Sequence, residues 1–386
     1  MTLRAVPAAI GVLLVAAHYW LIPYLGLLAA SCAALFTAVS PAMVYYSRYF
    51  IHETLLVFLT FCALLALLGY QRSPGSARAI AVGALFGLMF ATKETWIVAA
   101  AGMLVAVPVR PSARHLTLAA LAFLAVAAAF FSSSIVDSIL AYGTYFARGM
   151  GVNTVHVHPW YYYFECLRGE ALIGALAIAG LLAPGAPRFL KIYTVFMAAA
   201  YCAIPYKAPW NVLSFWHAAI LLAGTGVVWL AQRVPKPLAI ALVGIGVAHL
   251  GWQARADSFQ YASDPRNPWV YAHTGTDVFL IVKQVDALAA AHPVQIFTRE
   301  NLWPLPWYFR RYPNVRWWNG VSDSTPLAPV ILATPDMEPA LLHRIYEVPP
   351  PGQREMYVSL FDRYVELRPR VEVRGYVAKS LWDELP

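Results

Sequence analysis

Ten apolar runs fill the first two thirds of the chain and predict membrane-spanning helices. They cover approximately residues 5–18, 22–40, 53–70, 79–92, 96–109, 115–133, 168–183, 189–205, 212–231 and 237–253. Several are shorter than the roughly 20 residues that a helix needs to cross the hydrocarbon core, so kinked or partly buried helices are expected among them. The pattern predicts a polytopic α-helical membrane domain over residues 1–254.

After about residue 255 the chain becomes polar and proline-rich, which indicates a soluble domain over residues 255–386. Hydrophobic periodicity predicts helices at 278–291 and 305–311 and strands at 294–298, 315–318 and 330–333. One or two further strands are expected between residues 357 and 377. Helices alternating with strands favour a small α/β fold for this domain.

Basic residues occupy every second loop between the apolar runs and predict the orientation of the helices. The pairs are Arg72 and Arg78, Arg110 and Arg114, Arg188 and Lys191, and Arg233 and Lys236. By the positive-inside rule these loops face the cytoplasm. The alternate loops, including the long segment 134–167, then lie on the outer side of the inner membrane, as does the soluble domain. Within that segment, residues 136–146 are expected to form an amphipathic helix on the membrane surface.

Composition supports a membrane protein and argues against a nucleic-acid partner. Hydrophobic residues make up 60% of the chain and charged residues 12%, against roughly 25% charged in an average soluble domain. The net charge of +8 comes from short loops and not from a basic stripe. The four cysteines are scattered singly and are expected to be small core residues. No P-loop or GxGxxG motif is present.

The alternate loops carry mixed charges among aromatic residues, beginning with residues 41–53. Arg48, His52 and Glu53 lie here, where two apolar runs meet water. Ionisable groups at a membrane boundary are costly unless solvated or paired, so the cluster suggests a functional site. Glu53 could act as a general base or as a ligand to a divalent metal. Alternatively, it is a helix N-terminal acid that is stabilised by the helix dipole and by Arg48.

Two lysines lie at boundaries of the same kind. Lys93 precedes Glu94 between two apolar runs, and Lys207 lies in the sequence Tyr-Lys-Ala-Pro-Trp after Tyr206. Each lysine could contact a phosphate as a point charge, and the negative charge of Glu94 would weaken the electrostatic field of Lys93. The alternative is that both lysines extend to water as interfacial anchors.

The segment Val-His-Val-His-Pro-Trp-Tyr-Tyr-Tyr-Phe-Glu begins at residue 155. In an extended chain, His156 and His158 would point the same way, which is a possible metal-ligand spacing, although two histidines more often have a structural role. The aromatic run with Trp160 and Tyr161, which ends at Glu165, is typical of a membrane-interface belt; stacking on a sugar is the alternative.

Five of these motifs occur in order and carry a resemblance to a known family. They are Tyr45-Tyr46-Ser47-Arg48, Phe90-Ala91-Thr92-Lys93-Glu94, His158-Pro159-Trp160-Tyr161-Tyr162-Tyr163, Lys207-Ala208-Pro209-Trp210 and Trp303-Pro304-Leu305-Pro306-Trp307-Tyr308. The chain resembles the flippase-activity-associated membrane proteins of archaea and bacteria. These belong to the GT-C glycosyltransferase clan, with protein O-mannosyltransferases and lipid A aminoarabinose transferases.

The resemblance implies a GT-C-like enzyme, or the larger part of one, that moves a sugar from a polyprenyl-phosphate lipid to an acceptor at the outer membrane face. The acceptor could be a protein, a lipid or a glycan. Glu53 matches the family's second acidic position, and Glu94 would orient Lys93. The phosphate pocket would hold Arg48, Lys93 and Lys207, supported by His52, His158, Trp160, Tyr161, Glu165 and Tyr206.

The resemblance also predicts what this chain does not contain. The family places its main catalytic acid in the first outer loop after an initial span, and the chain is expected to begin after that point. An even number of spans agrees, because it places the N-terminus outside with nothing upstream to direct its translocation. A flippase or transporter component and a non-catalytic scaffold therefore remain alternative functions.

Overall fold

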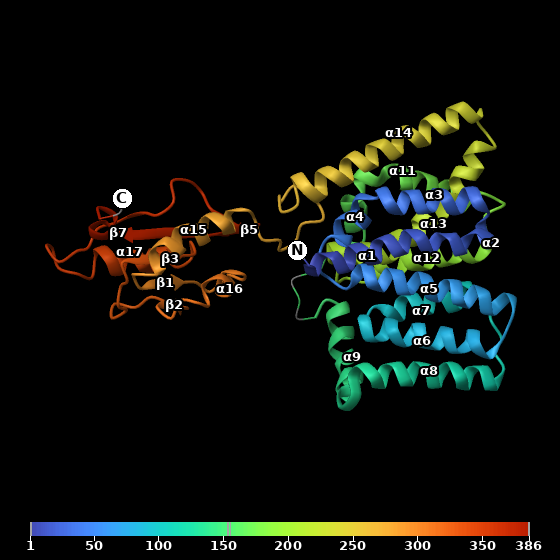
Figure 1. The fold of residues 1–386 in the computed structure, drawn as a ribbon, viewed down its shortest axis with the longest axis horizontal. Coiled ribbons are helices and arrows are strands. Elements are labelled where there is room, and N and C mark those ends of the chain that lie inside the picture. The colour runs from blue at the N-terminus through green and yellow to red at the C-terminus, as the bar shows by residue number, and fades with distance from the viewer. Residues whose placement is uncertain (1, 153, 155, 385–386) are drawn as a thin grey trace. The chain divides into compact units, whose positions relative to one another are not determined.

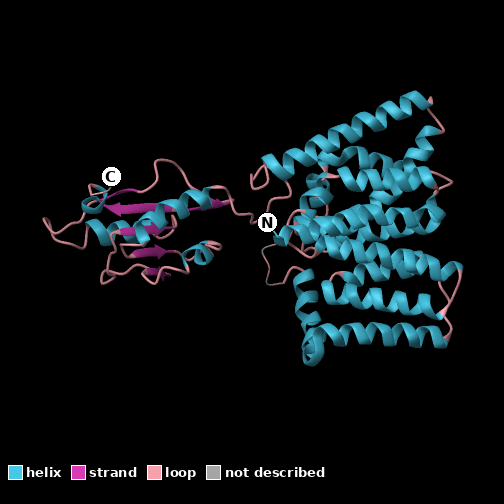
Figure 2. Ribbon diagram, in the orientation of Figure 1, coloured by secondary structure: helices cyan, strands magenta, loops and turns pink. Residues whose placement is uncertain are grey.

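The computed structural model describes residues 2–152, 154 and 156–384. The chain folds into two compact units, Met1–Tyr261 and Ala262–Pro386. The first unit is built from helices and the second contains the sheets (Figures 1 and 2).

Helices in the first unit cover all ten predicted apolar runs. They are α1 (Thr2–Ala17), η1 (His18–Leu21), α2 (Ile22–Leu25), α3 (Leu27–Val39), α4 (Pro41–Ser47), α5 (Glu53–Arg72), α6 (Ser76–Thr92), α7 (Trp96–Ala106), α8 (Ala113–Phe131), η2 (Ser132–Ser134), α9 (Ile135–Gly149), α10 (Tyr162–Cys166), η3 (Arg168–Glu170), α11 (Ala171–Leu182), α12 (Arg188–Ala203), η4 (Pro209–Asn211), α13 (Val212–Ala231), α14 (Lys236–Arg255) and η5 (Ala256–Gln260).

Length and composition decide which of these helices can cross a membrane. Among the described residues, five helical segments are long and apolar enough: Leu3–Leu25, Glu53–Arg72, Ala113–Phe131, Pro209–Ala231 and Lys236–Gln260. A sixth is obtained if α3 and α4, which bend by 59°, form one broken span. The protein is an integral membrane protein, and the count of ten spans stays a prediction.

The run at residues 22–40 was predicted as one helix, and this is wrong. Pro23 lies in the short helix α2, which Gly26 ends with a φ of +81°. Residues other than glycine rarely adopt that backbone conformation, and it makes the chain turn there before α3 begins. At the far end, Ser40 accepts a hydrogen bond from the Met43 backbone N–H, and Pro41 opens α4. Local capping chemistry therefore interrupts a continuous apolar pattern.

Helices α11 and α13 approach each other at glycines on both sides. A Cβ atom at Gly226 would lie 1.9 Å from the Leu176 carbonyl oxygen, and one at Gly180 would lie 2.2 Å from that of Leu222. Small residues of this kind let membrane helices pack backbone to backbone. This contact fixes the position of α13, which begins directly after the segment that contains Lys207 and Asn211.

We expect Gly226→Ala to lower the midpoint of thermal unfolding, because the added methyl group forces α11 and α13 apart. Overpacking of this kind costs about 1–3 kcal/mol. The matched control is Gly251→Ala on α14, where nothing lies within 4 Å of the Cβ atom that the change adds. Thermal unfolding of both variants in detergent checks the prediction. Equal midpoints would contradict it.

The second unit is a mixed α/β fold, as its alternating pattern predicts. Its elements are α15 (Asp277–Ala289), β1 (Val294–Phe297), α16 (Leu305–Phe309), β2 (Val315–Trp318), β3 (Val330–Ala333), α17 (Glu338–Tyr346), β4 (Tyr357–Ser359), β5 (Glu366–Arg368), β6 (Val371–Glu372), β7 (Arg374–Ala378) and α18 (Lys379–Trp382). The main sheet has the order β2-β1-β3-β7-β4, in which β1 runs parallel to β2 and β3, and β7 runs antiparallel to its neighbours. Strands β5 and β6 pair separately.

Alternate residues of β1 and β3 belong to separate hydrophobic clusters. Ile296 packs in a cluster with Ile281 of α15, whereas Phe297 packs with Leu341 of α17. Both strands are buried along their full length, so β3 is a continuous apolar run, and the one polar residue of β1, Gln295, hydrogen-bonds to the backbone of Pro326 and Ala328.

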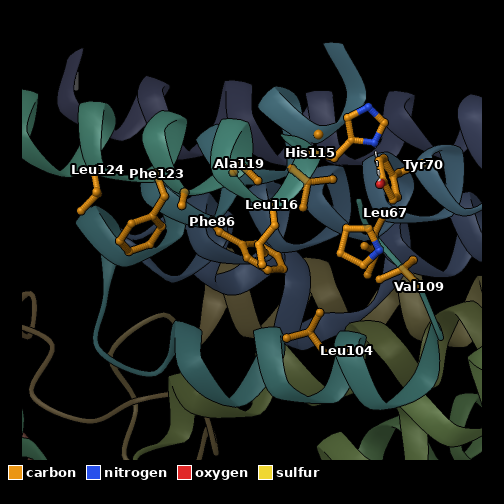
Figure 3. A pocket seen from close by; sticks show the side chains of 15 residues that line it. Leu67, Tyr70, Phe86, Leu104, Val109, His115, Leu116, Ala119, Phe123 and Leu124 are labelled. Carbon is orange, nitrogen blue, oxygen red and sulfur yellow. Dashed lines mark hydrogen bonds between the residues drawn. The ribbon is translucent and has the colours of Figure 1, made fainter. Parts of the chain in front are cut away.

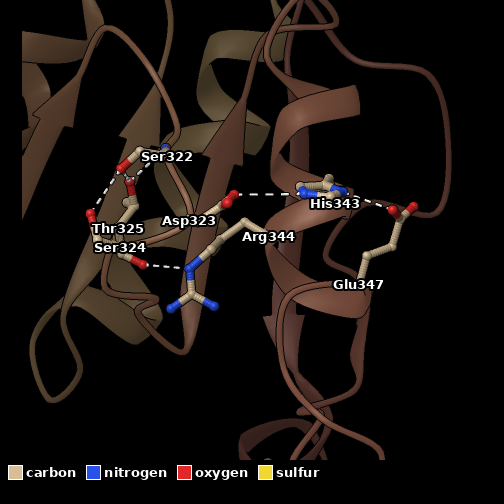
Figure 4. A network of polar contacts seen from close by, with 7 residues as sticks. All are labelled: Ser322, Asp323, Ser324, Thr325, His343, Arg344 and Glu347. Carbon is tan, nitrogen blue, oxygen red and sulfur yellow. Dashed lines mark hydrogen bonds and ion pairs between the residues drawn. The ribbon is translucent and has the colours of Figure 1, made fainter.

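Helix α17 was not predicted from the sequence, although Leu341 and Ile345 have helical spacing and are buried. Polar contacts tie it to the loop that precedes β3 (Figure 4). Arg344 Nε donates to the Thr325 carbonyl oxygen at 2.9 Å, and the His343 ring lies 2.7 Å from Glu347 and 3.6 Å from Asp323. The His343 contacts are largely exposed to solvent, so each contributes at most about 1 kcal/mol.

Candidate functional site

The acidic residues of the first unit lie away from the helix ends that carry the four basic pairs. The acidic residues are Glu53, Glu94, Asp137, Glu165, Glu170 and Asp257. None belongs to the connections α5–α6, α7–α8, α11–α12 or α13–α14, at which the four basic pairs lie. Successive helices α5 to α8 run back and forth, so Glu53 and Glu94 lie at one end of these helices and the arginine pairs at the other (Figure 1). The mixed-charge end is the candidate site.

A buried ion pair forms the centre of this site. Lys93 Nζ lies 2.5 Å from Glu53 Oε1 and donates a second hydrogen bond to Asn211 Oδ1 at 2.8 Å. The side chains of Lys93 and Glu53 are only 8% and 4% exposed. Glu53 begins α5 and Lys93 follows the last residue of α6, so the pair joins the ends of two neighbouring helices. Glu53 therefore holds the Lys93 ammonium in a fixed position.

Two expectations about this pair need correction. Arg48 does not pair with Glu53: its guanidinium donates to the Ser258 carbonyl oxygen and lies 3.6 Å from the centre of the Phe259 ring. Helix α14 ends in a π-helical turn, which supplies both of these contacts. Glu94 does not orient Lys93 either, because Glu53 and Asn211 hold that ammonium. His52 is the other neighbour of Glu53, with 3.8 Å between Nε2 and Oε1.

Lys207 is held by a short antiparallel contact between two of the sequence motifs. Val157 and Tyr206 form an isolated β-bridge. On either side of it, the Lys207 N–H donates to the His156 carbonyl oxygen at 2.9 Å, and the His158 N–H donates to the Pro205 carbonyl oxygen at 3.1 Å. The His156 and Tyr206 rings also meet edge to face. Residues 156–158 and 205–207 thus fix the backbone from which the Lys207 side chain extends.

The Lys207 side chain is buried without a carboxylate partner among the described residues. The residue is 1% exposed, and its ammonium donates to the Ile204 carbonyl oxygen. Burial lowers the pKa of this ammonium, because a charge is costly to remove from water. Lys207 lies four residues before Asn211, the residue that binds Lys93. The two lysines are therefore linked by one short segment, and Lys207 supplies a positive charge that an anion could neutralise.

A cavity of about 210 Å³ adjoins Lys93. Phe90, Glu94, Ser138, Tyr142 and Tyr145 are among its lining residues, so it combines aromatic rings with hydroxyl and carboxylate groups. The Phe90 and Tyr142 rings lie nearly parallel with centres 6.0 Å apart, and Trp96 Nε1 donates to the Tyr142 hydroxyl at 2.8 Å.

Three of these lining residues, Ser138, Tyr142 and Tyr145, come from helix α9, which matches the amphipathic helix predicted at 136–146. Its apolar residues Ile139, Leu140 and Phe146 are exposed in the first unit. Helix α9 therefore closes one side of the cavity while presenting an apolar surface elsewhere.

The remaining predicted residues belong to the aromatic segment 158–165. The His158 ring stacks on Tyr162 with centres 4.1 Å apart. Trp160 and Tyr161 are 66% and 44% exposed, and Glu165 lies 3.8 Å from Arg168 in an exposed ion pair. The ion-pair partner of Glu165 is thus Arg168 and not Lys93.

The proposed metal ligands do not form a metal site. Across residues 2–152, 154 and 156–384, no three His, Cys, Asp or Glu side chains are grouped closely enough to hold a metal ion. Glu53 is bound to Lys93, and His158 stacks on Tyr162. The donor set does not fit a divalent cation.

Sequence reasoning missed two polar residues at this end of the bundle. Asn211 binds Lys93 and follows the Lys207 motif directly. Glu170 is fully buried and accepts hydrogen bonds from Ser40 Oγ, the Ala42 N–H and Trp216 Nε1 at 2.5, 2.8 and 2.7 Å. It thereby fixes the bend between α3 and α4. Its position at the start of an apolar run was the same signal that identified Glu53.

Comparisons with known proteins agree with this architecture. A family model described as dolichyl-phosphate-mannose-protein mannosyltransferase matches residues 1–110, which include Glu53 and Lys93. The solved structure of ArnT from Cupriavidus metallidurans in the apo state matches with a TM-score of 0.63 at 14% identity, covering 96% of this chain and 83% of that one. The chain has the fold of GT-C glycosyltransferases.

Two other solved structures support the GT-C fold. ArnT from Cupriavidus metallidurans bound to undecaprenyl phosphate matches with a TM-score of 0.58 at 13% identity, covering 97% of this chain and 83% of that one. An oligosaccharyltransferase from Archaeoglobus fulgidus, in complex with zinc and sulfate, matches at 0.51 and 14% identity, covering 87% of this chain and 56% of that one. No curated protein sequence matches the chain.

Proposed function

We propose that this GT-C protein transfers a sugar from a polyprenyl-phosphate lipid to an acceptor at the outer face of the inner membrane. The buried ammonium of Lys207, which has no carboxylate partner within residues 2–152, 154 and 156–384, is the observation that carries the proposal. Isolated buried charges are strongly unfavourable, and a phosphate from a lipid donor would neutralise this one. Lys93, held by Glu53 and Asn211, supplies the second positive charge.

The chemistry requires positive charge where the phosphate leaves. In the transfer, the bond between the anomeric carbon and the donor phosphate oxygen breaks, and the electron pair leaves with the polyprenyl phosphate. The acceptor oxygen bonds to the anomeric carbon and gives up its proton to a carboxylate. The sugar passes through an oxocarbenium-like state. Because the leaving phosphate gains a negative charge, Lys93 and Lys207 stabilise the transition state more than the bound donor.

The cavity beside Lys93 suits the sugar and the acceptor oxygen. Tyr142 and Phe90 offer ring faces, while Ser138 and Glu94 offer hydrogen-bonding groups. Glu94 lines this cavity, whereas the Glu53 carboxylate is buried and accepts a hydrogen bond from the Lys93 ammonium. Glu94 is therefore the better placed of the two carboxylates to accept the proton of the acceptor, and Glu53 acts as a positioning residue for Lys93.

A transfer assay tests the proposal. Purified protein is reconstituted in liposomes and supplied with a polyprenyl-phosphate donor whose sugar is radiolabelled. Two quantities are measured: the loss of label from the lipid and the transbilayer movement of the lipid. We expect label to leave the lipid, and Lys93→Met to slow this at least about 100-fold, as removal of one electrostatic stabiliser does elsewhere. Lipid movement without transfer would instead support a transporter. If the protein binds neither the donor nor the product, the result would support a non-catalytic scaffold.

His158 should make donor binding depend on pH. Burial, together with the neighbouring His156 and Lys207 side chains, lowers the pKa of His158 from its ordinary value, so the neutral ring predominates at pH 7. Protonation at lower pH adds positive charge near Lys207, and the donor is a phosphodiester whose single charge stays constant. We expect donor affinity to rise about threefold or more between about pH 7.5 and about pH 5.5.

The control for this prediction is His158→Gln, which should remove the pH dependence of binding. Because the folded-state pKa of His158 lies below its unfolded value, protonation also costs folding stability as the pH falls through this range. Fluorescent donor titrations are therefore corrected for the folded fraction at each pH. A pH dependence that persists in His158→Gln would assign it to another group.

A further inference from the structure

An apolar groove has one end near Arg72, Arg78, Arg110 and Arg114. Its volume is about 470 Å³, and its lining residues come from α5, α6, α7, α8 and the α7–α8 connection (Figure 3). Tyr70 lies 17 residues after Glu53 on α5, which is about 25 Å at 1.5 Å per residue. The Tyr70 end of the groove therefore lies far from the chemistry at Glu53 and Lys93, whereas the Phe123 ring at its other end packs beside Phe90, which lines the cavity next to Lys93.

The groove is apolar along its length and polar at one end. Phe123 and Leu124 of α8 lie at one end in the view of Figure 3, and Tyr70 and His115 lie at the other. The Tyr70 hydroxyl and His115 Nδ1 are 2.9 Å apart. Leu116 and Leu124, which line the groove, are 61% and 53% exposed in the protein. In a membrane, this surface faces lipid chains.

All four arginines of the adjoining connections lie at the polar end. Arg72 is two residues from Tyr70, and Arg78, Arg110 and Arg114 are each next to a residue that lines the groove. Arg72 and Arg78 each donate to a backbone carbonyl oxygen, of Pro23 and Ser73. The α5–α6 and α7–α8 connections contain no acidic residue, so these four charges are not balanced locally.

We infer that this groove binds one anionic phospholipid, with an acyl chain along α8 and the phosphate among the four arginines. The apolar length fits a hydrocarbon chain, and the Tyr70–His115 pair lies where the ester groups would follow the phosphate. Basic pockets between membrane helices bind lipid head groups in this way. A second apolar groove, between α3, α13 and α14, has one basic lining residue, Lys236, and lacks this combination.

Positive charges in loops also act as topology signals, which alone would explain the arginines. The two explanations differ in one respect. A topology signal needs only charge at this end of the helices, whereas a lipid site needs the charges beside the groove. Arg188 and Lys191 lie in the first turn of α12 and carry the same charge away from the groove, so they provide a matched control.

Native mass spectrometry of the full chain in detergent tests this inference, with phosphatidylglycerol and phosphatidylcholine of identical acyl chains as probes. We expect one phosphatidylglycerol to bind at least about tenfold more tightly than phosphatidylcholine. Each arginine near an anionic head group contributes about fivefold, so Arg110→Gln with Arg114→Gln should weaken phosphatidylglycerol binding about 25-fold. That change should leave phosphatidylcholine binding unaltered.

Two further variants make the result specific. Ala120→Trp fills the groove from an exposed position and should weaken binding of both lipids. Arg188→Gln with Lys191→Gln should change neither affinity. Equal binding of the two lipids by the unaltered protein would overturn the inference, as would an equal loss of phosphatidylglycerol binding in the Arg188 and Lys191 variant. Neither readout depends on sugar transfer.

Discussion

Lys207→Met is expected to weaken binding of a polyprenyl-phosphate sugar at least about 30-fold and to raise the stability of the ligand-free protein. Removing one partner from a buried charge pair costs about 2–5 kcal/mol of binding free energy. The opposite effect on stability has the same cause. Without a ligand, the Lys207 ammonium is buried with no carboxylate partner among the described residues, and methionine removes that penalty.

Lys191→Met is the matched control. The Lys191 ammonium also donates to a backbone carbonyl oxygen near the end of a preceding helix, that of Ala183 at 2.6 Å, but Lys191 lies in the first turn of α12, at the end of the bundle that carries the arginine pairs. We expect Lys191→Met to leave donor affinity unchanged. Fluorescence titration with a labelled donor measures the affinity, and thermal unfolding in detergent measures stability. A Lys207→Met protein that binds normally, or that unfolds at a clearly lower temperature, would show that Lys207 is a structural anchor.

The helices were predictable because their signals are local. Long apolar runs predicted α5, α13 and α14, and the change in composition predicted the α/β fold of the second unit. The interruption at Gly26 was missed because a single positive-φ residue hardly changes an apolar pattern. Helix α17 was missed because only one face is buried, so Leu341 and Ile345 stand among polar residues.

The site was predictable as a set of residues but not as a set of contacts. Glu53, Lys93 and Lys207 were found because ionisable groups are costly at membrane boundaries. Their partners depend on how helices far apart in sequence meet. Glu53 pairs with Lys93, 40 residues away, and Lys93 reaches Asn211, which is 118 residues away. Arg48 is the lysine or arginine nearest to Glu53 in sequence, yet its guanidinium contacts Ser258 and Phe259 instead.

Removing the Glu53–Lys93 ion pair in two steps should have separate effects on folding stability and on donor binding. Glu53→Gln leaves the Lys93 ammonium buried with Asn211 as its described partner, and the free energy of unfolding should fall by about 3–5 kcal/mol. Adding Lys93→Met removes the stranded charge, so the double variant should recover most of that loss. The coupling energy from the double-mutant cycle should exceed about 2 kcal/mol. Lys379→Met, which breaks the exposed pair with Asp383, is the control and should cost less than about 1 kcal/mol.

Donor binding should not recover with stability. If Lys93 contacts the donor phosphate, the double variant folds well but binds the polyprenyl-phosphate sugar as weakly as Lys93→Met alone, because both lack the ammonium. If the pair only joins α5 to the end of α6, binding returns together with the unfolding midpoint. The same protein preparation yields both measurements, so poor folding cannot be mistaken for loss of a phosphate contact. A double variant with recovered stability and full donor affinity would therefore remove Lys93 from the phosphate site and leave Lys207 as its only proposed lysine.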